Sequence, residues 1–121
     1  MKYLLDTNAV IYFLKGTGNF EFINENDDLM LSFITIIELL AFAKERDKEN
    51  IQAFLMLCER IFVDGSLMKT VIRIRKELKL KIPDAIISAT SLEKEAILVT
   101  ADKEMINKCT NIGIVVINPL E

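Results

Sequence analysis

Short, continuously apolar runs alternate with helical segments along the chain, and this alternation restricts the possible folds more than any other feature. We expect five strands, at residues 2–5, 29–33, 61–63, 97–100 and 114–117. Helices are expected between them, because apolar side chains recur there at helical spacing. Strands without polar alternation are typical of a parallel sheet that is covered on both faces. With 121 residues, the chain is predicted to form a single α/β domain spanning residues 1–121.

Polar residues are expected to begin and end several helices. Asn8 is predicted to cap the first helix, which Gly16 would end. Thr35 is predicted to begin a helix that reaches about residue 45, with Glu38 at the capping-box spacing Thr-x-x-Glu. Ser66 is expected to cap the helix that follows Gly65.

Histidine is absent from the sequence, which narrows the possible chemistry. Ser-His-Asp, Cys-His and paired-histidine mechanisms all need an imidazole as general base. Hydrolysis would therefore depend on carboxylates, lysine or a metal ion. Zinc is not expected, because Cys58 and Cys109 stand apart and form no C-x-x-C pair. We expect both thiols to be reduced, in a cytoplasmic protein, because the N-terminus has no signal-peptide pattern.

Four acidic residues occupy comparable places relative to the expected strands. Asp6 directly follows the first strand, and Asp102 lies two residues beyond the fourth. Glu38 is early in the helix after the second strand, and Asp84 is in the first turn of a helix that begins at Pro83. Because loops at the carboxyl ends of parallel strands converge on one edge of a sheet, we expect these four carboxylates to meet there.

Each of these acids also has an ordinary structural explanation. Asp6 can begin a turn, Asp102 can cap a helix, and Asp84 gains from a helix dipole. Glu38 is the hardest to explain in this way, because its helix is apolar on nearly every side and is expected to be buried. Two carboxylates ~4 Å apart repel by roughly 4 kcal/mol at an effective dielectric constant near 20, so a cluster needs cations. Oxygen ligands of this kind favour Mg²⁺ or Mn²⁺, which can activate water for phosphodiester hydrolysis.

Four sequence segments carry a resemblance to a known family. They are LLDTNAVI, the acidic residue within FITIIELLAFA, IPDAIISATS and LVTADKEM, at residues 4–11, 33–43, 82–91 and 98–105. In this order they resemble the PIN domain family, specifically the VapC-type toxins of toxin–antitoxin pairs. The resemblance implies a PIN-like three-layer α/β/α sandwich with a central, mostly parallel sheet of four to five strands.

The same resemblance implies a function and the residues that perform it. Asp6, Glu38, Asp84 and Asp102 would be the catalytic residues and hold one or two Mg²⁺ or Mn²⁺ ions. Thr7, Asn8 and Thr100 would support them by hydrogen bonds. The implied activity is metal-dependent cleavage of single-stranded RNA, often in structured RNAs such as tRNA. The implied partners are an inhibitory antitoxin and a second copy of the chain in a homodimer.

Basic residues on one predicted helix face are candidates for RNA binding. Lys69, Arg73 and Lys76 recur at helical spacing opposite the apolar stripe, and Lys103 directly follows Asp102. The alternative is an ordinary solvated helix face. The net charge of −3 provides no overall attraction for nucleic acid, so any contact depends on such local patches.

Other functions remain open from the sequence. A phosphatase of the HAD type also begins with a strand and an aspartate, but needs a second aspartate where this chain has Asn8. A receiver-like signalling domain needs a phosphoacceptor aspartate that residues 50–60 do not offer. A catalytically silent PIN-like binding module is the third alternative, and the presence of all four acids argues against it.

Overall fold

A five-stranded, entirely parallel sheet forms the centre of the molecule in a computed structural model that describes residues 1–121. Its strand order is β3-β2-β1-β4-β5. The strands are β1 (Lys2–Leu5), β2 (Asp28–Ser32), β3 (Glu59–Ile61), β4 (Ile97–Val99) and β5 (Val116–Ile117). The predicted α/β class and parallel sheet are therefore confirmed, with strand ends shifted by one or two residues.

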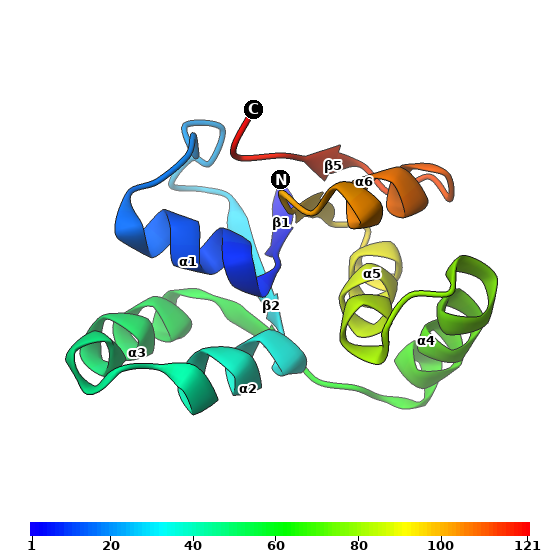
Figure 1. The fold of residues 1–121 in the computed structure, drawn as a ribbon, viewed down its shortest axis with the longest axis horizontal. Helices are drawn as coiled ribbons and strands as arrows, with labels where there is room; N and C mark the ends of the chain where they lie inside the picture. The colour runs from blue at the N-terminus through cyan, green and yellow to red at the C-terminus, as the bar shows by residue number, and fades with distance from the viewer.

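Six α-helices cover the two faces of this sheet (Figure 1). Helices α1, α2 and α3 lie on one side of the strands, and α4 and α5 lie on the other. The helices are α1 (Thr7–Lys15), α2 (Phe33–Phe42), α3 (Lys48–Leu57), α4 (Gly65–Leu78), α5 (Ile82–Lys94) and α6 (Lys103–Thr110), with a short 3₁₀ helix η1 (Glu45–Asp47) before α3. The expected three-layer arrangement is therefore confirmed.

Two hydrophobic clusters fill the space between the layers, one on each face of the sheet. Leu4 belongs to the cluster that includes side chains of α4, α5 and α6. The next residue, Leu5, belongs to the cluster with side chains of α1, α2 and α3. Both leucines are fully buried. Because successive strand side chains point to opposite faces, burial on both faces explains why the strands are apolar without alternation.

Two helices begin earlier than the sequence predicts, because the residue that ends the preceding strand region acts as the cap. Asp6, and not Asn8, caps α1 by accepting a hydrogen bond from the Ala9 amide at 2.8 Å. Ser32, and not Thr35, caps α2 by accepting from the Ile34 amide at 3.3 Å. The capping-box interpretation of Thr35 and Glu38 is therefore wrong, and both residues lie inside the helix.

The structure also corrects the predicted start of α4 and the predicted end of α2. Asp64, and not Ser66, caps α4 through a 2.8 Å hydrogen bond from the Leu67 amide. Helix α2 ends at Phe42 instead of near residue 45. Gly16 does end α1, in the left-handed conformation with φ of 73°, as predicted.

Helix α2 is also less buried than its composition predicts. Ile37 is 54% exposed and Phe42 is 84% exposed, whereas Leu39 is buried. Only one face of the helix contacts the core. Glu38 is half-buried, so the expectation of a carboxylate surrounded by apolar side chains is wrong.

The strand order fixes where a ligand site can form. The chain runs from β1 to β2 to β3 in one direction and then returns to place β4 on the other side of β1. The carboxyl ends of β1 and β4 therefore lie next to each other where the winding direction reverses, which is the usual ligand site of such sheets. No helix of the chain combines the length and apolar character needed to cross a membrane. Cys58 and Cys109 are free thiols, the first half-buried and the second buried.

Candidate active site

All four predicted acids line one pocket at the carboxyl edge of the sheet. The pocket has a volume of about 150 Å³ and is lined by Asp6, Thr7, Asn8, Glu38, Pro83, Asp84, Ile87 and Asp102. The acids come from four elements: the end of β1, the middle of α2, the first turn of α5 and the residue before α6. No lysine or arginine is among the lining residues, so the pocket concentrates negative charge.

Asp6 is the most buried of the four acids, with 8% of its surface exposed. One carboxylate oxygen accepts the Ala9 amide, and the other accepts the Thr100 hydroxyl at 2.5 Å. Burial raises the pKa of Asp6 above its ordinary value, and the charges of Asp102 and Asp84 raise it further, against the effect of the two hydrogen bonds. The folded chain therefore holds this carboxylate in an environment that disfavours its negative charge.

Asp84 lies half-buried in the same pocket and accepts no hydrogen bond through its carboxylate. Burial raises its pKa, and the charge of Asp102 raises it further, whereas Lys81 acts in the opposite direction. Asp102 is exposed and caps α6 through one oxygen, which accepts the Glu104 and Met105 amides at 2.9 and 3.2 Å. Its second oxygen accepts no hydrogen bond.

Hydroxyl groups hold two of the acids in place. Thr100 donates to Asp6 and accepts the Asp102 amide at 3.1 Å, so it links the ends of β1 and β4. Thr7 donates to Glu38 at 2.6 Å. The sequence analysis expected Thr7, Asn8 and Thr100 to support the acids by hydrogen bonds. Thr7 and Thr100 form such bonds, whereas the Asn8 side chain forms none with the four acids. Asn8 lines the pocket and is exposed.

Thr35 is a further residue near the site that the sequence interpretation missed. It is fully buried, and its hydroxyl lies 3.2 Å from the hydroxyl of Thr7. The available signal was its position three residues before Glu38, which places both on one helix face. The capping-box interpretation used the same spacing and assigned Thr35 to the helix end instead.

The donor set of the pocket fits a divalent cation that retains water. No three of its carboxylates approach closely enough to ligate one ion directly. Mg²⁺ is commonly bound through only one or two protein carboxylates, with waters completing its octahedron. Four oxygen donors around a pocket of about 150 Å³ suit that mode, and Asp84 has a free carboxylate to offer.

The predicted RNA-binding residues lie outside the pocket. Lys69, Arg73 and Lys76 are exposed on α4, and Lys103 is exposed in the first turn of α6. None of the four lines the acidic pocket. Lys81, which precedes α5, is the lysine whose charge lowers the pKa of Asp84.

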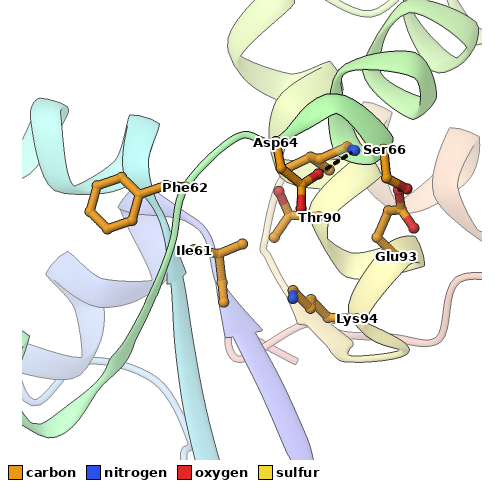
Figure 2. A pocket seen from close by; sticks show the side chains of 8 residues that line it. Ile61, Phe62, Asp64, Ser66, Thr90, Glu93 and Lys94 are labelled. Carbon is orange, nitrogen blue, oxygen red and sulfur yellow. Dashed lines mark hydrogen bonds between the residues drawn. The ribbon is translucent and has the colours of Figure 1, made fainter.

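A second polar pocket lies between the start of α4 and the end of α5 (Figure 2). Its volume is about 80 Å³, and its polar lining residues are Asp64, Ser66, Thr90, Glu93 and Lys94. Ser66 donates to Glu93 at 2.7 Å, and Asp64 caps α4. Because its carboxylates and hydroxyls already have hydrogen-bond partners, this pocket is not the candidate active site.

Comparison with known proteins identifies the family. The family model described as "PIN domain" matches residues 3–110. The chain belongs to the PIN domain family. This PIN domain includes all four acids of the pocket within the matched residues.

Curated relatives of this PIN domain include Ribonuclease VapC1 of Haemophilus influenzae, strains R2866 and 86-028NP. Each is 39% identical over 70 residues, covering 52% of this chain and 52% of the relative. The chain thus spans about half the length of the curated relatives it matches.

Solved structures share the fold over almost the whole chain. A toxin–antitoxin complex from Klebsiella pneumoniae contains a chain that is 27% identical, with a TM-score of 0.77 and 98% coverage of both chains. VapBC2 from Rickettsia felis, bound to a DNA fragment from its promoter, gives a TM-score of 0.80 at 22% identity and 98% coverage of both chains. At that identity the second comparison supports the PIN-like fold alone.

Proposed function

We propose that this protein is a divalent-metal-dependent endoribonuclease that cleaves single-stranded regions of RNA. The observation that carries the proposal is the meeting of Asp6, Glu38, Asp84 and Asp102 around one pocket at the switch point of the sheet. Burial and neighbouring carboxylates raise the pKa values of Asp6 and Asp84, so the charged forms of both side chains are disfavoured. A cation bound in the pocket would stabilise these charged forms. The similarity to Ribonuclease VapC1 supports the choice of RNA as substrate.

In the proposed site the four acids hold one or two Mg²⁺ or Mn²⁺ ions. Bound ions of this kind supply a water-derived nucleophile and stabilise the charge that develops on the phosphate. The chain itself orients the carboxylates: Thr100 fixes Asp6, Thr7 fixes Glu38, and the amides of α6 fix Asp102. The Asp84 carboxylate accepts no hydrogen bond, so its side chain is free to turn toward a ligand.

A solved structure with a similar fold supports a biological setting for the proposed activity. The similar chain from Klebsiella pneumoniae is part of a toxin–antitoxin complex. We propose that this chain, as one domain over residues 1–121, is the toxin of a type II pair with an antitoxin protein as partner, acts as a homodimer, and cleaves structured RNAs such as tRNA.

The first experiment tests cleavage and its metal dependence together. Purified protein is expected to cut single-stranded RNA in Mn²⁺ or Mg²⁺ and to stop in EDTA. Asp84→Asn should abolish cutting while the chain stays folded, because the Asp84 carboxylate supports no hydrogen bond in the protein. Asp6→Ala should also abolish cutting, but it removes the cap of α1 and should cost about 1 kcal/mol of stability.

The control variant for this experiment is Glu93→Gln in the second pocket, which should cut like the wild type. Cleavage that continues in EDTA would contradict the metal mechanism. Growth arrest on expression, relieved by Asp84→Ala, tests the toxin role separately. A wild type that leaves growth unchanged would contradict that role and leave the nuclease proposal intact.

Two alternatives give different results in the same assays. A HAD-like phosphatase would release phosphate from small esters, and the position that such an enzyme needs as aspartate is Asn8, which lines the pocket. A silent binding module would show little heat on titration with Mn²⁺, and Asp6→Asn would change nothing. The four acids gathered around one pocket favour the nuclease over both.

A further inference from the structure

Thr35 differs from Thr90 and Thr110, which lie inside α5 and α6, in the partner of its hydroxyl. Thr90 and Thr110 each donate to the carbonyl four residues earlier in their own helix. This back-bonding is the usual way in which a helical threonine satisfies its hydroxyl. Thr35 is fully buried, and the hydrogen-bond partner of its hydroxyl is Thr7 Oγ1 in another helix, at 3.2 Å. A buried hydroxyl whose partner lies in another helix needs an explanation other than local helix geometry.

The direction of this contact follows from counting protons. A threonine hydroxyl has one proton to donate and lone pairs that accept. Thr7 Oγ1 lies 2.6 Å from Glu38 Oε1 and 3.2 Å from Thr35 Oγ1. A carboxylate is the stronger acceptor, and the shorter distance agrees with a charge-assisted hydrogen bond. Thr7 therefore gives its proton to Glu38, and Thr35 gives its own proton to Thr7.

We propose that Thr35 is a positioning residue for Glu38 and acts through the hydroxyl of Thr7. When Thr35 donates to Thr7, it occupies a lone pair of that oxygen and fixes the rotation of the hydroxyl, so the Thr7 proton points at Glu38. Thr35 and Glu38 lie three residues apart on α2, and Thr7 is the first residue of α1, so the chain of hydroxyls also fixes α1 against α2. The proposal rests on the proposed function, in which Glu38 helps to hold a divalent cation.

The test compares Mn²⁺ affinity in two matched variants of the full chain by calorimetry. Thr35→Val keeps the shape and removes the hydroxyl, and we expect Mn²⁺ binding to weaken about 10-fold, the lower end of the effect of losing an outer hydrogen-bond partner. Thr90→Val is the control, because Thr90 is equally buried but bonds only within its own helix. It should bind Mn²⁺ like the wild type, and Thr35→Ser should restore most of the affinity.

Cleavage gives a second readout that a general loss of stability would not produce. The turnover of Thr35→Val at low Mn²⁺ should fall, its KM for RNA should stay unchanged, and saturating Mn²⁺ should restore turnover. If Thr35→Val does not fold, Thr35→Ser and Thr35→Ala form the deciding pair, because they differ by one hydroxyl. Equal Mn²⁺ affinity in the compared variants would overturn the role of Thr35 and leave the nuclease intact. A wild type that binds no Mn²⁺ would overturn both proposals.

Discussion

Two pockets of the molecule contain similar chemical groups but differ in how far these groups already have partners. One is the acidic pocket at the ends of β1 and β4, and the other is the smaller pocket between α4 and α5. Each has carboxylates and hydroxyls in its lining. In the smaller pocket Glu93 accepts the hydroxyls of Ser66 and Thr70, and Lys94 provides an opposite charge nearby. In the acidic pocket no basic residue is present, and the Asp84 carboxylate accepts no hydrogen bond.

This difference shows what separates a binding site from a polar surface feature. The smaller pocket satisfies its carboxylates and hydroxyls by itself, so a ligand would have to displace existing hydrogen bonds. The acidic pocket leaves negative charge without a partner, and the raised pKa values of Asp6 and Asp84 show that the charged forms are disfavoured there. A cation gains most where the protein has left negative charge without a partner.

The largest difference is expected when one carboxylate is neutralised in each pocket in turn and RNA cleavage by the two variants is compared. Asp102→Asn should reduce RNA cleavage at least ~100-fold, because loss of a cation-holding carboxylate should exceed the loss of an outer partner. Asparagine also caps helices well, so α6 should be kept. Glu93→Gln should cut at the wild-type rate. Comparable losses in the two variants, measured as turnover in Mn²⁺, would remove the distinction between the pockets.

Metal binding should stabilise the fold through the acidic pocket alone. At a free Mn²⁺ concentration of 100 times Kd, the free energy of unfolding should rise by about 2.7 kcal/mol. Thermal or urea unfolding with and without Mn²⁺ measures this change. Glu93→Gln should keep the full increase, and Asp84→Asn should lose most of it. An equal increase in both variants would place the cation elsewhere.

Without metal, the acidic pocket should destabilise the chain as pH rises. Burial raises the pKa of Asp6 and Asp84 in the folded state above the ordinary 3.8, so just above that pH the folded chain holds more protons than the unfolded chain. Stability from these two groups is therefore lost as pH rises through their folded-state pKa values.

Asp84→Asn should flatten this part of the profile and raise the free energy of unfolding at pH 7. We expect a gain of less than about 1 kcal/mol, because solvent screens a half-exposed group. Urea unfolding in EDTA across pH measures both changes. A destabilised Asp84→Asn variant would show that Asp84 is satisfied in the free protein, like the acids of the smaller pocket.

The smallest effects are expected on α4. Lys76 lies near the end of α4 that connects to α5 and Asp84, whereas Lys69 lies two turns earlier. Lys76→Ala should raise the KM for RNA a few-fold and lower the salt dependence by about one counterion, if it contacts a phosphate. Lys69→Ala should have the smaller effect. The reverse order would indicate that RNA approaches from the side of the smaller pocket.

Sequence reasoning predicted the fold and the gathering of acids because both depend on simple patterns. Unalternating apolar strands required cover on both faces, and acids after strands had to meet at one edge. The sequence did not reveal which of several nearby polar residues caps a helix. Aspartate and asparagine are both good N-cap residues, so Asp6 and Asn8 were both possible caps for α1. Which of them acts as the cap depends on how soon α1 begins after β1. The exposure of Ile37 and Phe42 depends on which neighbours α2 meets, which composition does not reveal.

The bond between Thr100 and Asp6 connects residues 94 positions apart. The first acid of the site therefore emerges from the ribosome long before its partner strand β4 exists. A nascent chain that has not yet reached residue 102 lacks one of the four carboxylates, and strand β1 has no neighbour on that side. The four carboxylates of the proposed site therefore cannot come together before synthesis has passed residue 102.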